Sequence, residues 1–135
     1  AGNNRLEGLA GNDRLDGGVG ADTLIGGDGS DSFRFDSLLN ALSNVDTITD
    51  FSVAADSIEL ENAIFGSLTS TGTLAAGAFR AGAGVSAADG NDYILYDSVS
   101  GALYYDADGN GARAAVQFAS LSSGLALSNA DFLVT

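Results

Sequence analysis

Residues 8–34 consist of three consecutive units of nine residues, GLAGNDRLD (8–16), GGVGADTLI (17–25) and GGDGSDSFR (26–34). Each unit has a glycine at its fourth position, an aspartate at its sixth and a large apolar residue at its eighth, namely Leu15, Leu24 and Phe33. Leu6 lies nine residues before Leu15, so an incomplete fourth unit opens the chain. A flexible linker would not keep this spacing, so the stretch is interpreted as a structural repeat.

Each part of the unit has a structural task. Glycine tolerates positive φ and lets the backbone turn sharply, which directs carbonyl groups inward. The three residues after each aspartate form a short strand whose middle, apolar side chain points inward. If successive strands enter opposite sheets, two units make one 18-residue coil, so we expect Leu6 to stack on Leu24 and Leu15 on Phe33. The sequence therefore predicts an all-β fold, a parallel β-roll.

In such a roll the turns of units two apart lie one above the other. We therefore expect one cation between Asp13 and Asp31, and another between Asn4 and Asp22. Carboxylate and carbonyl oxygens are the donors that Ca²⁺ prefers. The predicted metal ligands are Asn4, Gly8, Ala10, Gly11, Asp13, Gly17, Val19, Gly20, Asp22, Gly26, Asp28, Gly29 and Asp31.

The charge balance supports this interpretation. The chain carries 18 acidic residues, 15 of them Asp, against five Arg and no Lys, for a formal charge of −13. This negative charge disfavours nucleic acid as a partner. Without cations, the acidic side chains should repel one another in a compact state. We therefore expect calcium binding and folding to be one event.

The chain lacks the residues that several classes of catalytic and metal site require. The chain has no His and no Cys, which removes the Ser-His-Asp triad, most zinc sites and disulfides. Carboxylate pairs can hydrolyse glycosides, but these acids lie in repeat turns without other catalytic groups, so no enzyme activity and no catalytic residue is expected. No apolar run has the length of a membrane span.

Residues 37–135 are expected to cover the open end of the roll (residues 1–36) as a mainly antiparallel β cap, in one continuous domain. A helical turn capped by Ser37 is expected over 37–44, and a short helical piece near 74–79. A hairpin is expected around Ser98–Gly101. Strands are expected near 45–51, 57–61, 93–97, 102–105, 115–118 and 131–134.

Two further acidic groups allow two interpretations each. Asp106, Asp108 and Asn110 match the first half of an EF-hand loop, but Gln117 stands where the twelfth-position Glu belongs, and a hydrophilic hairpin turn fits equally well. Asp46 and Asp50, with Asp56, either complete a calcium site at the last loop of the roll or are solvated acids at strand edges.

At these residues the sequence resembles the RTX family, the calcium-binding nonapeptide repeats of secreted bacterial proteins. The similarity extends to the segment after the repeats and to residues 103–119. It implies a β-roll with calcium in its turns and export by a type I ABC transporter that reads an uncleaved C-terminal signal. Two departures are Leu9, in place of a glycine, and Asn4, in place of an aspartate, which should weaken the site shared with Asp22.

The favoured function is a calcium-triggered folding module, secreted to the extracellular space, that carries the export signal of a longer protein. We expect it to be a monomer. Residues 129–135 are either part of that signal or a last strand, or both. The alternative is a carbohydrate-binding accessory module, because repeat modules of alginate epimerases resemble this chain; exposed tyrosines at 93, 96, 104 and 105 would then contact a polysaccharide.

Overall fold

The strands of the repeat form two parallel stacks that face each other. The computed structural model describes all residues, 1–135. The first sheet contains seven strands, in spatial order β1 (Arg5–Glu7), β3 (Thr23–Ile25), β5 (Asp46–Ile48), β11 (Val116–Ser120), β10 (Ala102–Tyr105), β9 (Ile94–Asp97) and β8 (Phe79–Gly82). The second contains five strands, in spatial order β2 (Arg14–Asp16), β4 (Ser32–Phe35), β6 (Ser57–Leu60), β12 (Phe132–Val134) and β7 (Gly72–Thr73).

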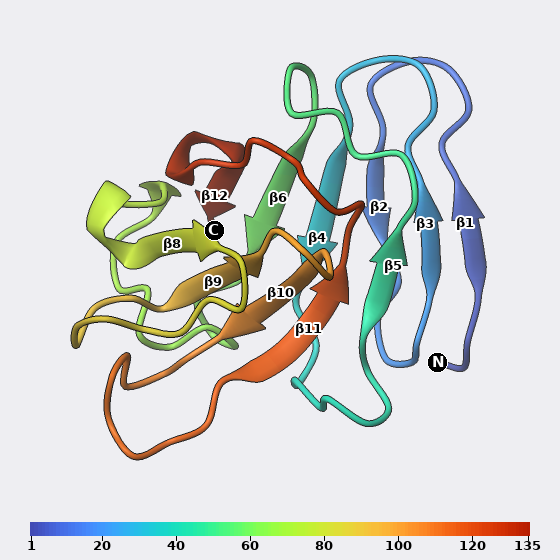
Figure 1. Ribbon diagram of the computed structural model, residues 1–135. Helices are drawn as coiled ribbons and strands as arrows, with labels where there is room; N and C mark the ends of the chain where they lie inside the picture. The colour runs from blue at the N-terminus through green and yellow to red at the C-terminus, as the bar shows by residue number, and fades with distance from the viewer.

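The predicted stacking of the repeat is confirmed. Leu6 pairs with Leu24 between β1 and β3, and Leu15 pairs with Phe33 between β2 and β4, both in parallel register. Figure 1 shows these N-terminal strands side by side at one end of the molecule, with the chain crossing from one sheet to the other at every turn. The β-roll predicted from the nine-residue period is therefore the observed architecture.

The parallel stacks extend beyond the repeat. Ile48 continues the apolar ladder of Leu24, and Ile58 continues that of Phe33, each in register with its neighbour. The ladder ends with Phe132 on β12, and these inward side chains are almost fully buried. The sheets thus run without interruption across residue 36, because Asp46–Ile48 and Ser57–Leu60 repeat the order of polar and apolar residues found in the strands before them.

The cap is built from later strands that join the ends of both sheets. β10 pairs antiparallel with β9 and with β11, and β7 pairs antiparallel with β12, whereas β11 and β12 join the roll strands β5 and β6 in parallel, so the cap mixes both kinds of pairing. β8 lies parallel to β9. Two single-turn 3₁₀ helices, η1 (Ala76–Ala78) and η2 (Asn129–Asp131), precede β8 and β12. The expected hairpin and the short helical piece near 74–79 are both present.

A turn forms within the expected range 37–44, but the prediction that Ser37 caps it was wrong. The turn closes at Asn40, whose carbonyl accepts the amide of Asn44 at 2.8 Å, while the Ser37 hydroxyl donates to the Gly18 carbonyl at 2.8 Å. Asn44 in turn accepts the Gly20 amide at 2.7 Å. The segment therefore bonds to the neighbouring turn of the roll, and this tertiary contact overrides the local helix signal.

Candidate calcium-binding turns

The repeat aspartates form two ladders along the edges of the roll. Asp22 Oδ1 accepts the backbone amide of Asn4 at 2.6 Å, and Asp46 Oδ1 accepts that of Asp22 at 2.9 Å. On the opposite edge, the Oδ1 atoms of Asp31 and Asp56 accept the amides of Asp13 and Asp31, each at 2.9 Å. One oxygen of each of these four carboxylates thus binds the backbone of the preceding coil. This hydrogen bond fixes the direction of the other oxygen.

In the three complete repeat units, the Oδ2 oxygen of the aspartate has no partner within the protein. The Oδ2 atoms of Asp13, Asp22 and Asp31 are buried and accept no hydrogen bond. The residues Asp22 and Asp31 are only 2% and 1% exposed, so water cannot solvate their charges freely. Burying a carboxylate oxygen without a partner is costly, and native structures rarely tolerate it. Three such oxygens at equivalent positions of a repeat point to a ligand that the protein atoms do not supply.

The first glycine of each unit leaves room beside the orphaned oxygen. A Cβ atom on Gly8 would lie 2.7 Å from Asp13 Oδ2 and 2.6 Å from the Gly26 carbonyl oxygen. A Cβ on Gly17 would lie 2.5 Å from Asp22 Oδ2, and the equivalent atom on Gly26 would collide with Asp31 Oδ2. At Gly8, a carboxylate oxygen from one coil and a carbonyl oxygen from the next therefore border one small space, which only glycine leaves open.

These donors fit calcium. Nowhere in the chain do three or more His, Cys, Asp or Glu side chains gather around a common point, so a metal in the turns would depend on backbone carbonyls. Ca²⁺ accepts six to eight oxygen ligands in flexible geometry, including carbonyls. The carbonyls of Gly8, Ala10, Gly11, Gly17, Gly20, Gly26 and Gly29 accept no hydrogen bond. The residues of both expected pairs lie next to each other, but the identity of the ligands stays a prediction.

Two of the predicted carbonyl ligands are already engaged. The Val19 carbonyl accepts the Gly2 amide at 3.1 Å, and the Asp28 carbonyl accepts the Gly11 amide at 2.8 Å. Each retains a second lone pair, but its first task is to hold neighbouring coils together. The side chain of Asp28 is exposed and makes no hydrogen bond or ion pair.

Three acids after the repeat play different parts. Asp50 accepts the amides of Gly26 and Gly27 at 3.0 and 2.8 Å, and Asp56 uses its second oxygen to accept the Ser52 amide at 2.8 Å. Both carboxylates therefore cap backbone turns with both of their oxygens. The pKa of Asp46 is raised to about 6, first by burial and then by the charges of Asp22 and Asp16. Asp46 thus lies in the same uncompensated ladder as Asp22.

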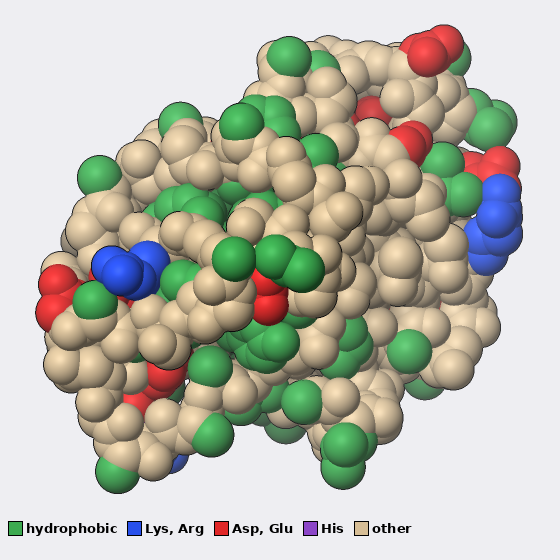
Figure 2. All heavy atoms as spheres, in the orientation of Figure 1, with side chains coloured by type: hydrophobic (Ala, Val, Ile, Leu, Met, Phe, Trp, Pro, Cys, Tyr) green, Lys and Arg blue, Asp and Glu red, His purple; other side chains and the backbone are tan.

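The arginines compensate other acids. Arg14 pairs with Glu59 at 2.7 Å and Arg34 with Glu61 at 2.9 Å on the outer face of the second sheet, and Arg5 pairs with Glu7. No arginine reaches the aspartates of the ladders. Figure 2 shows, on one face of the molecule, carboxylates in small separate groups, some of them beside arginine atoms. The positive charge that the ladders need must therefore come from outside the chain.

The EF-hand interpretation of residues 106–117 does not match the structure. The segment connects two antiparallel strands, β10 and β11, and no helix flanks it. Gln117 lies on β11 and donates to the Ala119 carbonyl and to the Ser120 hydroxyl. The hairpin interpretation therefore describes its topology, although Asp106 and Asp108 each retain a buried oxygen without a partner.

The expectation of four exposed tyrosines was wrong. Tyr96 and Tyr105 are buried, and their hydroxyls donate to the Ser122 carbonyl at 2.5 Å and to the Ser67 hydroxyl at 3.0 Å. Their rings belong to the core because β9 and β10 pack against the second sheet. Tyr93 and Tyr104 remain partly exposed.

Sequence reasoning missed the polar residues that join the turns. Asn3 and Asn12 accept the amides of Ala21 and Ser30 at 3.0 and 2.9 Å, so each bridges two stacked turns through its side chain. Both occupy the fifth position of their unit, directly before the sixth. An asparagine that recurs at this position was the signal that could have revealed their role. These bonds and the aspartate ladders together fix the spacing of the coils.

Comparison with known proteins agrees with this geometry. Residues 1–33 match the model of the RTX calcium-binding nonapeptide repeat, in four copies. Among solved structures, the chain is similar to the AlgE6R3 subunit of the mannuronan C5-epimerase from Azotobacter vinelandii, with 28% identity and a TM-score of 0.54 over 98% of this chain and 73% of that one. No curated protein sequence matches. No helix is long and apolar enough to cross a membrane.

Proposed function

Because the chain carries four RTX calcium-binding nonapeptide repeats in residues 1–33 and so belongs to the RTX family, we propose that it is a module whose folding is switched on by calcium outside the cell. One observation carries the proposal: the unpartnered, buried Oδ2 atoms of Asp13, Asp22 and Asp31. Without a cation these carboxylates oppose folding, and with calcium they join the coils. The chain has no catalytic task of its own in this proposal.

The switch follows from the difference in calcium between compartments. In calcium-poor cytosol, a chain of net charge −13 with uncompensated ladders is expected to stay unfolded and pass through a transporter. Outside, calcium binding contributes its free energy only to the folded state, because the paired turns exist only there. Folding from the repeats onward would also discourage return into the cell.

Far-UV circular dichroism of the chain with calcium and with a chelator tests the switch. The proposal expects β structure with calcium and an unfolded spectrum in chelator, with magnesium at equal concentration unable to replace calcium. A spectrum that is equally folded in chelator would refute it. Size-exclusion chromatography with calcium tests the accompanying expectation of a monomer.

We further propose that the last residues carry the signal for a type I ABC transporter. In the folded chain, β12 lies between β6 and β7 and its residues Phe132 and Val134 are buried, so a transporter could read them only before folding. Export of a reporter fused upstream of the chain, compared with the same fusion lacking residues 129–135, tests this. Equal export of both fusions would count against it.

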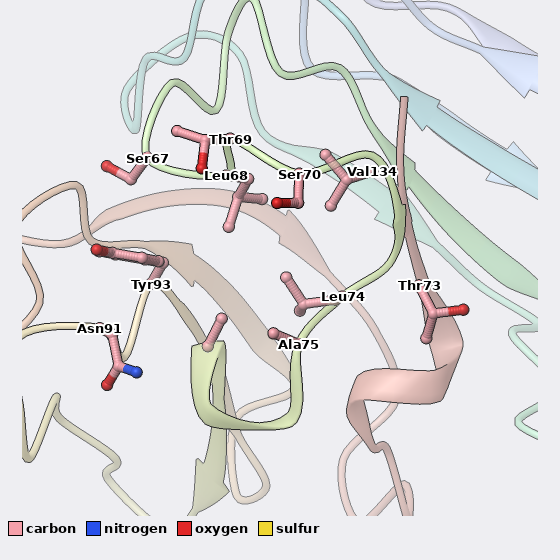
Figure 3. Close-up of a pocket in the computed structure, with 11 residues that line it drawn as sticks. Ser67, Leu68, Thr69, Ser70, Thr73, Leu74, Ala75, Asn91, Tyr93 and Val134 are labelled. Atoms are coloured by element: carbon pink, nitrogen blue, oxygen red, sulfur yellow. The ribbon is translucent and has the colours of Figure 1, made fainter.

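A second candidate function is contact with a polysaccharide. The similarity to a subunit of a mannuronan epimerase favours it, and so does a pocket beside the partly exposed Tyr93. In Figure 3, Tyr93 and Asn91 lie on one side of this pocket and Ser70, Leu74 and Val134 on the other. Titration with neutral and acidic oligosaccharides in calcium tests it. Tyr93→Ala should weaken binding, whereas Tyr104→Ala, the other partly exposed tyrosine, should not.

A further inference from the structure

A second group of unpartnered carboxylates lies in the cap, outside the repeat. Asp106 follows β10 directly, and its backbone amide donates to the Tyr93 carbonyl at 2.8 Å, which fixes the start of the loop to the neighbouring strand segment. The residue is 6% exposed, and its Oδ1 accepts no hydrogen bond. Asp108, two residues on, also has a buried Oδ1 without a partner.

Nothing in the protein neutralises this pair. The second oxygen of Asp108 accepts the Arg113 backbone amide at 3.0 Å, but the guanidinium groups of Arg80 and Arg113 form no ion pair. All ion pairs of the chain use Arg5, Arg14 or Arg34, which belong to the roll strands. Two neighbouring carboxylates are thus held at the base of one loop without a cation.

The adjoining loop brings further oxygens. The backbone amide of Asn110 donates to the Asp89 carbonyl at 2.9 Å, and its side-chain amide donates to the Ala88 carbonyl at 3.3 Å. A Cβ on Gly109 would lie 2.5 Å from the Asp89 carbonyl oxygen and 2.7 Å from that of Gly90. The loop that contains the two carboxylates is therefore packed directly on backbone carbonyls.

The second loop is itself held in place. The buried Asp92 accepts hydrogen bonds from the amides of Ala88 and Asp89 at 2.7 and 3.2 Å, and these bonds hold the turn in place. The carbonyls beside Gly109 consequently have a defined position. A fixed set of carboxylate and carbonyl oxygens, without nitrogen or sulfur, is suited to a hard cation.

We propose that Asp106 Oδ1 and Asp108 Oδ1 bind a calcium ion in the cap, with the 88–90 segment and water supplying the remaining oxygens. This site shares no residue with the repeats, so it can be tested independently of the calcium sites proposed there. It locks the β10–β11 loop onto the loop before β9, so calcium orders the cap as well as the roll. The competing explanation is a proton shared between the two carboxylates, without any metal.

The tyrosines offer a probe of this site. All four tyrosines lie between residues 93 and 105, Tyr105 adjoins Asp106, and the repeats contain none. Terbium substitutes for calcium at oxygen sites and emits when a nearby excited tyrosine transfers energy to it. Tyrosine-sensitised Tb³⁺ luminescence of the full chain, followed by competition with Ca²⁺, therefore favours an ion beside Tyr105, and a variant in the roll distinguishes it from ions in the turns.

The expected result is emission from the wild type that calcium displaces. Asp106→Asn and Asp108→Asn should each weaken terbium binding at the tyrosine-sensitised site at least about tenfold, since even outer-shell partners of metals are worth about 10–100-fold. Asp28→Asn removes an equal charge from an exposed side chain that makes no hydrogen bond and lies outside this site, so it should leave the signal. Asp31→Asn in the roll should also leave it, provided that the chain is folded in calcium.

Three results would overturn the proposal. The folded wild type could give no tyrosine-sensitised emission, which is what a shared proton predicts. The Asp106 and Asp108 variants could bind terbium as well as the Asp28 variant does. The emission could also vanish with Asp31→Asn in a chain whose near-ultraviolet dichroism remains native. If Asp106→Asn does not fold, Asp108→Asn, at the less buried residue, carries the comparison.

Discussion

Replacing Asp31 by asparagine should stabilise the calcium-free fold and reduce the stability that calcium adds to it. Asparagine retains an oxygen that can accept the Asp13 amide, now at 2.9 Å from Asp31 Oδ1, but it carries no charge. Asp31 is 1% exposed and its Oδ2 has no partner, so the substitution removes a buried, uncompensated charge. Relief of that burial should stabilise the calcium-free fold by about 1–3 kcal/mol.

With calcium the same substitution removes a carboxylate ligand. Because outer-shell partners already contribute about 10–100-fold to metal affinity, we expect at least about tenfold weaker binding at this turn. The stability that saturating calcium adds to the fold should therefore be smaller than in the wild type by about 1.4 kcal/mol. This loss is set against the gain of the calcium-free fold, so the diagnostic quantity is the calcium-dependent part of the stability.

The assay is urea unfolding followed by circular dichroism at a series of calcium concentrations that fold the chain, with the calcium-free stability obtained by extrapolation. Asp28→Asn is the matched control, because Asp28 lies in the same turn, loses the same charge and has an exposed side chain without hydrogen bonds. A purely electrostatic effect of net charge would shift both variants equally. An equal gain of stability from calcium in Asp28→Asn and Asp31→Asn would refute the assignment of a ligand role to the buried oxygen.

Three further predictions concern strain, the core and pH. Leu9 has φ of 76° and is 69% exposed, so Leu9→Gly should relieve backbone strain and raise the free energy of unfolding by about 0.5–1 kcal/mol in urea titrations, whereas Leu9→Ala should not. Phe33→Ala empties a fully buried position of the apolar ladder and should cost about 3–5 kcal/mol, seen as a lower melting temperature in saturating calcium; an unchanged value would contradict the roll. Burial, followed by the charges of Asp22 and Asp16, raises the pKa of Asp46 from 3.8 to about 6, so the calcium-free fold binds protons more tightly than the unfolded chain. Its stability should fall as pH rises from about 4 to about 6, and Asp46→Asn should flatten that slope in unfolding measured at several pH values.

The roll was predictable because its sequence signal is strictly periodic. Leu15 and Phe33 are 18 residues apart and occupy paired positions, as the two-unit coil requires. The next coil is longer: Phe33 pairs with Ile58, 25 residues on, and the extra residues leave the stack as a loop. The sequence did contain a signal for this pairing, since Asp56 precedes Ile58 by two residues, as Asp31 precedes Phe33.

The site was predictable only in part. The position of Asp31 within its unit indicated a carboxylate in a turn, but not that one oxygen bonds to the Asp13 amide and the other has no partner. For Asp50 the sequence left a metal ligand and a solvated acid as alternatives, and the structure has it cap the amides of Gly26 and Gly27. Such differences arise from contacts between coils, which residue type and spacing along the chain do not specify.

The position of calcium itself is the most direct test of the central claim. Crystals grown in excess calcium would give an anomalous difference map in which the ions can be located. We predict an ion about 2.3–2.6 Å from Asp13 Oδ2, with backbone carbonyls of the stacked turns around it. A map without a peak at Asp13, Asp22 or Asp31, in a chain with the same fold, would contradict the account.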